Sequence, residues 1–148
     1  MQLLDISYSL DTIDVAAGRF WEVAKDFRII TFSGDLGAGK TTFISSLCNH
    51  LHVEDAVSSP TFALINQYGF AADGGEDVIF HLDWYRLRDT SEAINAGMED
   101  CLDQARAGAA YCFVEWPEKA QDLLRSPYLA VFISTTGPED RSMIVNQV

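Results

Sequence analysis

The stretch "FSGDLGAGKTTF", residues 32–43, decides how this chain of 148 residues is expected to fold. Within it, GDLGAGKT (34–41) matches the pattern G-x-x-x-x-G-K-[ST]. Glycines let the backbone turn tightly, so that successive N–H groups point inward at phosphate oxygens. The stretch therefore predicts a phosphate-binding loop, and a chance match in a glycine-rich turn is the alternative.

The segments on either side of the loop bear on these two interpretations. Before it, RIITF (28–32) is short, β-branched and apolar, which is typical of a buried parallel strand. After it, KTTFISSLCNHL (40–51) spaces its apolar residues as an amphipathic helix does. A helix that begins near Lys40 adds the partial positive charge of its N-terminus to the loop. This setting favours nucleotide binding.

The polar residues of the loop have expected roles toward a bound nucleotide. Lys40 can reach the β- and γ-phosphates, the Thr41 hydroxyl can bind Mg²⁺, and Thr42 can contact the α-phosphate. The residues of this loop that we expect to contact the nucleotide are Gly37, Ala38, Gly39, Lys40, Thr41 and Thr42.

Two acidic residues end apolar, strand-like segments: VIFHLD ends in Asp83, and YCFVE ends in Glu115. Mg²⁺ and an attacking water need carboxylates, and P-loop NTPases place an acid at the carboxyl end of a strand. Two such acids predict that at least one serves the metal. The pattern does not divide the roles between them, and a solvated acid is the alternative for each. His81, which alternates with apolar neighbours, is interpreted as a packed histidine.

Two further features have more than one interpretation. Thr61 in SSPTF (58–62) resembles a switch residue that senses the γ-phosphate, although a plain proline turn fits the pattern better. Trp84, Tyr85 and Trp116 flank the two acids and either pack against the sheet or present a surface to a partner.

The rest of the chain predicts strands that alternate with helices. Further strands are expected at residues 3–10, 62–68, 77–82 and 109–114, with a terminal hairpin at 128–134 and 141–148. A helix is expected over 11–27, capped by Asp11, and GFAADGGED (69–77) is predicted to be a surface turn. Asp89 and Glu92 predict a helix start, Gly97 an interruption, and Pro117 the first turn of a short helix.

These elements predict an α/β fold of the P-loop NTPase type in three layers. We expect one domain over residues 1–148, with a mostly parallel central sheet of about seven strands and an antiparallel C-terminal edge. In such sheets ligands bind beyond the carboxyl ends of the strands. The glycine loop, Asp83 and Glu115 are all expected there.

Composition narrows the classes of partner. The net charge is -12, from ten Lys and Arg against 22 Asp and Glu. Scattered basic residues argue against direct binding to DNA or RNA, which needs clustered Lys and Arg. A basic protein partner suits this surface better, and solubility is the simpler explanation of the charge.

The cysteines and the apolar runs predict a cytoplasmic protein. Cys48, Cys101 and Cys112 have no metal-binding spacing and are expected to be reduced core residues. No apolar run approaches the ~20 residues that span a membrane. The first residues do not have the pattern of a secretory signal.

Four blocks of this sequence, GDLGAGKTT, SPTF, HLDWYRL and VEWPEKA, resemble the TsaE family (also called YjeE) in order and spacing. These are small bacterial P-loop ATPases needed for threonylcarbamoyladenosine, a tRNA modification next to the anticodon. The resemblance covers about residues 10–134. It implies a seven-stranded sheet with helices on both faces, and ATP and Mg²⁺ as ligands. It also implies association with the TsaB–TsaD pair, so that tRNA is reached only through that complex.

The resemblance also implies roles for single residues. Thr41 and Glu115 would bind Mg²⁺, Asp83 would be needed for activity, and Thr61 would belong to a switch-like loop. The expected catalytic residues are Lys40, Glu115, Asp83 and Thr61. An N-terminal residue near the first helix would contact ATP, and Asp11 is expected there, with Thr12 as its neighbour.

The sequence departs from the family pattern at a few places, and its residues disfavour two other functions. Trp84 stands where the family more often has Leu, and residues 69–77 form a longer loop than usual. A small-metabolite kinase would need an arginine-rich lid, whereas Arg106, Arg125 and Arg141 are isolated in the sequence. A nucleotide-gated binding module without catalysis is disfavoured by the two acids.

Overall fold

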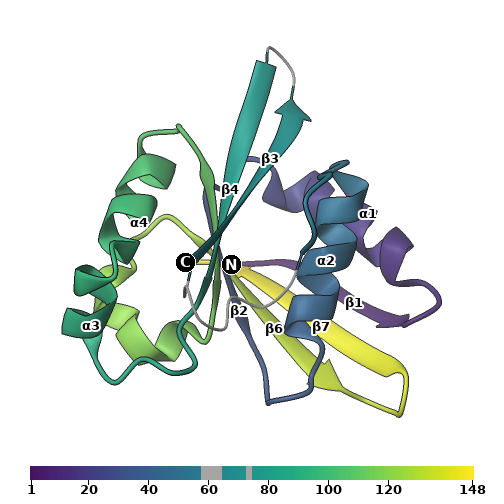
Figure 1. Cartoon of the computed structure of the whole chain (residues 1–148). Helices are drawn as coiled ribbons and strands as arrows, with labels where there is room; N and C mark the ends of the chain where they lie inside the picture. Colours follow the sequence, from purple (N-terminus) through teal and green to yellow (C-terminus); the bar gives the residue numbers. More distant parts are fainter. Residues whose placement is uncertain (58–64, 73–74) are drawn as a thin grey trace.

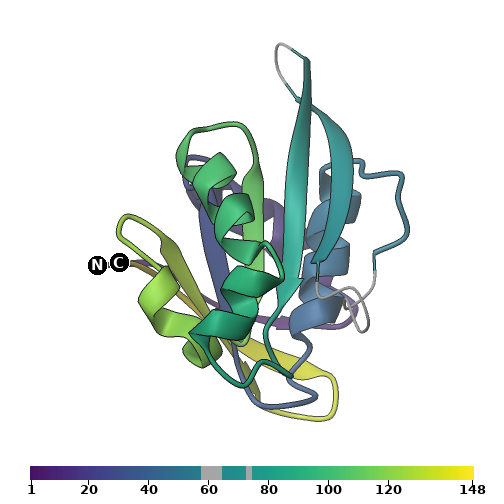
Figure 2. The same cartoon turned by 60° about the vertical axis from the view of Figure 1, so that its left-hand side comes forward.

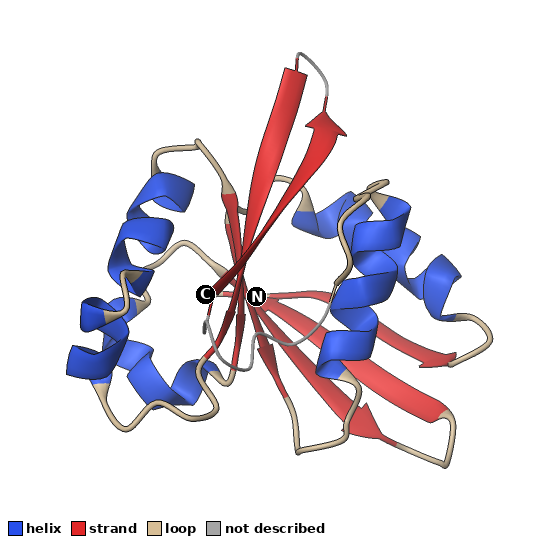
Figure 3. Ribbon diagram, in the orientation of Figure 1, coloured by secondary structure: helices blue, strands red, loops and turns tan. Residues whose placement is uncertain are grey.

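The structure, a computed structural model, describes residues 1–57, 65–72 and 75–148. Within these residues, seven strands form one sheet, with helices on both of its faces (Figures 1 and 3). The strands are β1 (Gln2–Ser9), β2 (Ile29–Ser33), β3 (Ile65–Ala72), β4 (Gly75–Asp83), β5 (Tyr111–Glu115), β6 (Leu129–Thr135) and β7 (Asp140–Gln147). The helices are α1 (Ile13–Ala24), α2 (Lys40–His50), α3 (Thr90–Asn95), α4 (Met98–Arg106) and the 3₁₀ helix η1 (Pro117–Leu123).

The sheet is mixed, which corrects the expectation of a mostly parallel one. Its strand order is β1-β7-β6-β2-β5-β4-β3. Three pairings are parallel, β2–β5, β2–β6 and β4–β5, and three are antiparallel, β1–β7, β6–β7 and β3–β4. The terminal hairpin is present, but β1 covers it and forms the edge of the sheet. The reason is that the N-terminal strand pairs with β7 along nearly its whole length.

The surface turn expected over residues 69–77 was wrong. Most of this segment belongs to the long β3–β4 hairpin, whose pairing runs from Ile65↔Leu82 to Ala72↔Gly75. Tyr68 and Phe70 are buried while Gly69 between them is exposed, so the segment keeps the period of a strand despite its glycines. The hairpin extends beyond the rest of the sheet (Figure 2).

The two faces of the sheet are covered by different helices. In Figure 1, α1 and α2 lie on the right of the sheet, and α3 and α4 lie on its left. Ile30 and Phe32 of β2 pack into the core under α1 and α2, whereas Ile29 packs into the core under α3, α4 and η1. Because β2 is covered on both faces, its residues from Ile29 to Phe32 are all buried and, apart from Thr31, apolar, which agrees with the buried strand that the sequence predicted.

The helix boundaries follow the sequence signals with one exception. Asp89 caps α3 and accepts a hydrogen bond from the Glu92 backbone N–H at 3.0 Å. Gly97, at φ 84°, separates α3 from α4, and Pro117 opens η1. The N-cap position of the first helix is Thr12 instead of Asp11. The Thr12 side chain makes no capping hydrogen bond to the helix and instead accepts one from the Ser9 backbone N–H at 2.9 Å.

Two expectations from composition concern the described residues directly. Cys48, Cys101 and Cys112 are buried free thiols, as expected. In residues 1–57, 65–72 and 75–148, no helix is both long enough and apolar enough to cross a membrane.

Candidate functional site

The glycine loop lies between β2 and α2, as its sequence predicts. Gly39 is the N-cap of α2 and has φ 94°, a left-handed value that favours glycine. Gly34 has φ 155°, and a Cβ atom there would lie 2.5 Å from the Ile133 carbonyl oxygen. The loop therefore needs glycine both for its turn and for its close approach to β6.

Lys40, at the start of α2, folds back over the loop. Its Nζ donates hydrogen bonds to the carbonyl oxygens of Gly34 at 2.6 Å and Asp35 at 3.1 Å, and lies 4.0 Å from the centre of the Trp116 ring. Burial lowers the pKa of Lys40, while nearby carboxylates, Glu115 first among them, act to raise it. The loop thus holds a cation where phosphates would approach.

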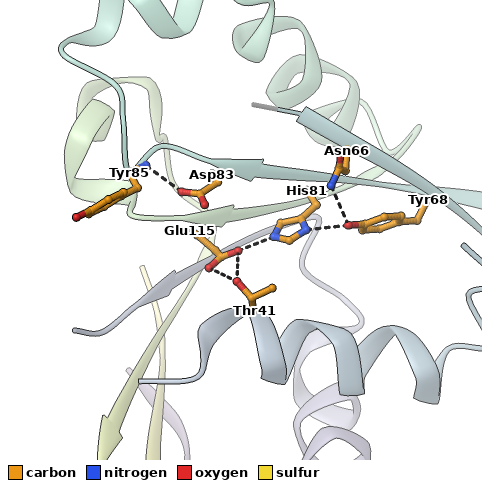
Figure 4. Close-up of polar contacts among 7 residues, drawn as sticks. All are labelled: Thr41, Asn66, Tyr68, His81, Asp83, Tyr85 and Glu115. Atoms are coloured by element: carbon orange, nitrogen blue, oxygen red, sulfur yellow. Dashed lines mark hydrogen bonds and ion pairs between the residues drawn. The ribbon is translucent and has the colours of Figure 1, made fainter. Parts of the chain in front are cut away.

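Thr41 and Glu115 meet across the end of the sheet (Figure 4). The Thr41 hydroxyl donates to both carboxylate oxygens of Glu115, at 2.9 Å from Oε1 and 3.0 Å from Oε2. His81 Nε2 lies 2.6 Å from Glu115 Oε2, and Tyr68 Oη lies 3.0 Å from His81 Nδ1. Only 2% of Glu115 is exposed, so these hydrogen bonds compensate the burial of its charge.

Asp83 ends β4 directly beside Glu115, because the two residues are register partners on adjacent parallel strands. Its carboxylate accepts a hydrogen bond from the Tyr85 backbone N–H at 2.9 Å. In contrast to Glu115, Asp83 is partly exposed, and both side chains line the cavity described next.

A cavity of about 500 Å³ opens over the loop and the ends of β4 and β5. This volume is in the usual range for small-molecule sites, about 300–1,000 Å³. The residues of the glycine loop and the start of α2 that line it are Leu36, Gly37, Gly39, Lys40, Thr41 and Thr42. The N-terminal wall is formed by Leu10, and neither Asp11 nor Thr12 lines the cavity in the described part of the chain.

Arg141 of β7 also lines the cavity, which sequence reasoning missed. Its Nε donates to the Ala38 carbonyl oxygen at 3.0 Å, and its Nη1 donates to the Gly137 carbonyl oxygen at 3.2 Å. Arg141 therefore connects the terminal hairpin to the glycine loop through a hydrogen bond to the loop backbone. No sequence signal links residues 103 positions apart, so only the fold shows this contact.

The structure shows how His81 and the aromatic residues that flank the two acids are packed. His81 is a packed histidine, as expected, but its contact with Glu115 was missed. Trp84 is fully buried in the core under α3 and α4, whereas the rings of Tyr85 and Trp116 pack together at 4.8 Å beside the cavity. Thr61 lies outside the described residues.

The donor set of this site fits Mg²⁺. The Thr41 hydroxyl and the Glu115 carboxylate offer oxygen ligands within 3.0 Å of each other, and Asp83 lies on the next strand. Among the residues that the structure describes, no cluster of three or more His, Cys, Asp or Glu side chains could hold a metal alone. Mg²⁺ is commonly bound through one or two carboxylates, waters and substrate phosphates, which this arrangement allows.

Comparison with known proteins gives the family. The family model described as "Threonylcarbamoyl adenosine biosynthesis protein TsaE" matches residues 8–143. The chain belongs to the TsaE family. This confirms the resemblance carried by the four sequence blocks, three of which surround the cavity in the described part of the chain.

Relatives in this family are similar over most of the chain. The protein named tRNA threonylcarbamoyladenosine biosynthesis protein TsaE from Bacillus subtilis is 34% identical over 125 residues, which cover 84% of this chain and 73% of that protein. The protein of the same name from Treponema pallidum is 26% identical, over 79% and 80% of the two chains. The one from Haemophilus influenzae is 34% identical over 65% of this chain and 56% of its own length.

A solved structure shares the fold of this chain. The crystal structure of Bacillus subtilis YdiB superposes with a TM-score of 0.68 and 24% sequence identity, covering 100% of this chain and 88% of that chain. The agreement supports the α/β architecture with its seven-stranded mixed sheet.

Proposed function

We propose that this chain is an ATPase that acts in the biosynthesis of threonylcarbamoyladenosine on tRNA. The observation that carries the proposal is the meeting of Thr41 and Glu115 at 2.9 and 3.0 Å, next to Lys40 in a phosphate-binding loop. The pathway comes from the family, whose members are named for threonylcarbamoyladenosine biosynthesis.

The residues of the site have different roles in the proposed ATP hydrolysis. The loop amides from Gly37 to Thr42 cradle the phosphates, and Lys40 exchanges its bonds to loop carbonyls for bonds to phosphate oxygens. Thr41 and Glu115 hold Mg²⁺, which when bound neutralises charge on the phosphates. Asp83 orients the attacking water from the neighbouring strand end.

The partners we propose are the TsaB and TsaD proteins in the cytoplasm. A chain with a net charge of -12 suits a basic protein surface better than an RNA backbone, so tRNA is reached only through the complex. We expect slow hydrolysis by the chain alone and faster hydrolysis in the complex, where hydrolysis resets the partners between turnovers.

The test is a complementation experiment with a matched control. A bacterial strain depleted of its own TsaE receives this chain, and the threonylcarbamoyladenosine content of its tRNA is measured by mass spectrometry. The wild-type chain and Lys25→Ala should restore the modification, because Lys25 is an exposed lysine that pairs with Glu22 just after α1 and does not line the cavity. Lys40→Ala should not. Equal restoration by Lys40→Ala would contradict the proposal.

A further inference from the structure

A continuous line of polar side chains runs from the glycine loop to the edge strand β3 (Figure 4). It passes from Thr41 to Glu115, from Glu115 to His81 at 2.6 Å, and from His81 to Tyr68 at 3.0 Å. The Asn66 side-chain amide donates to Tyr68 Oη at 3.4 Å. The line therefore crosses three neighbouring strands, β5, β4 and β3.

The register of the strands places these side chains on one face. Asn66 is the register partner of His81, and Tyr68 follows two residues later on the same face of β3. On β5, Glu115 lies two residues after Phe113, the register partner of His81. This face is the one covered by α1 and α2, so Thr41 at the start of α2 completes the line.

The direction of the hydrogen bonds follows from the groups involved. A carboxylate only accepts, so the Thr41 hydroxyl and His81 Nε2 both donate to Glu115. In a neutral imidazole Nδ1 then accepts from the Tyr68 hydroxyl, and in a charged imidazolium it donates to the same oxygen. In either form, His81 donates to Glu115 and Tyr68 fixes the ring.

Burial makes this arrangement rigid. The exposed fraction is 0% for His81 and 2% for both Tyr68 and Glu115. Water does not compete for these hydrogen bonds, and each buried polar group would lose free energy without its partner. The carboxylate plane of Glu115 is thus set by His81 at Oε2, while Thr41 contacts both oxygens.

We propose that His81, held by Tyr68, is a positioning residue that orients the Glu115 carboxylate and thereby sets the Mg²⁺ affinity of the nucleotide site. The inference rests on the proposed function, because it takes Glu115 as a ligand of Mg²⁺. Residues that hydrogen-bond to metal ligands typically change metal affinity 10- to 100-fold when they are replaced.

The test separates Mg²⁺ affinity from nucleotide affinity. Binding of a fluorescent ADP analogue to the full chain is measured in EDTA and then at increasing Mg²⁺, which gives an apparent dissociation constant for Mg²⁺. His81→Phe should raise this constant about 10- to 100-fold and leave ADP affinity in EDTA unchanged. His81→Gln, whose amide can donate near the position of Nε2, should recover most of the loss.

A second pair of variants keeps the test decisive if His81→Phe does not fold. Tyr68→Phe removes only the hydroxyl that holds His81, and should raise the Mg²⁺ constant about 3- to 10-fold. Tyr8→Phe is the matched control, since the Tyr8 hydroxyl is buried without a hydrogen-bond partner among the described residues. It should leave the constant unchanged.

The outcomes distinguish this inference from the proposed function. Wild-type Mg²⁺ affinity in folded His81→Phe, or equal constants for Tyr68→Phe and Tyr8→Phe, would overturn the role of His81 while leaving the proposed function intact. A wild-type chain that showed no Mg²⁺-dependent binding of the nucleotide would instead contradict the proposed function itself.

Discussion

The ends of β4 and β5 carry the same sequence pattern but very different surroundings. Each strand ends in an acid after an apolar run, and Asp83 and Glu115 are register partners. Glu115 is buried and bonded to Thr41 and His81. Asp83 is partly exposed and accepts a hydrogen bond from the Tyr85 backbone N–H. The neighbours of an acid, and not its place at a strand end, therefore decide what it can do.

Glu115 and Asp83 act unequally on the pKa of Lys40. Among the carboxylates that act to raise its pKa, Glu115 comes first and Asp83 comes third, after Glu118. The buried acid is thus the stronger electrostatic partner of the loop. The proposal that Glu115 serves the bound metal and Asp83 serves the water rests on geometry, because Glu115 and not Asp83 contacts the Thr41 hydroxyl among the hydrogen bonds of the described residues.

The largest effect is expected when the positive charge of Lys40 is removed. Lys40→Ala should lower ATP hydrolysis about 10²- to 10³-fold, because the phosphates lose the charge that stabilises them in the transition state. The measurement is steady-state ADP formation in the presence of TsaB–TsaD. Wild-type turnover by this variant would show that the loop is not the site of hydrolysis.

Replacing the partly exposed acid, Asp83, should affect the rate of ATP hydrolysis more than the binding of Mg²⁺. Asp83→Asn is expected to lower kcat about 10²-fold, because the attacking water loses the charged carboxylate that would accept its proton. Its apparent Mg²⁺ dissociation constant should stay within about 3-fold of the wild-type value, since losing one hydrogen-bond contact changes affinity little. Hydrolysis rates at saturating Mg²⁺ and Mg²⁺ titrations check the two halves of this prediction. A large loss of Mg²⁺ affinity would assign the metal to Asp83 instead.

Replacing the buried acid, Glu115, should instead affect the binding of Mg²⁺ directly. Glu115→Gln keeps the shape of the side chain but removes its charge, and is expected to weaken Mg²⁺ binding by about 10- to 100-fold. ADP affinity in EDTA should be unchanged. Nucleotide titrations with and without Mg²⁺ measure both quantities, and an unchanged Mg²⁺ constant would remove Glu115 from the metal site.

A third acid, Asp89, provides a structural reference for the other two. It caps α3 through the Glu92 backbone N–H and does not line the cavity. Asp89→Ala should lower the free energy of unfolding by about 1 kcal/mol, the usual cost of losing such a cap. Urea unfolding measures this loss. Mg²⁺ affinity should not change, and a change would mean that cavity and cap are coupled.

The sequence predicted the parts of the site that depend on local order. The glycine loop, with an apolar strand before it and a helix after it, needs only neighbouring residues to be recognised. Asp83 and Glu115 could be placed at strand ends for the same reason. Their roles could not be divided, because the contacts that distinguish them come from α2 and β4, far apart in the chain.

The parts that were missed depend on pairing between distant strands. The contact of His81 with Glu115 requires the register of β4 on β5, and the contact of Arg141 with the loop requires the place of β7 in the sheet. Residues 69–77, most of which belong to the β3–β4 hairpin, were predicted as a turn because their glycines and acids resemble one. Cross-strand pairing and the burial of Phe70 outweigh that local preference.

We propose that ATP hydrolysis by this chain depends on Mg²⁺ and is accelerated by the TsaB–TsaD pair. The most direct test is the rate of ADP formation by the purified chain, with and without TsaB–TsaD from the same source, in Mg²⁺ and in EDTA. We expect slow hydrolysis by the chain alone, clearly faster hydrolysis with the pair, and none in EDTA. Equal rates with and without the pair would contradict it.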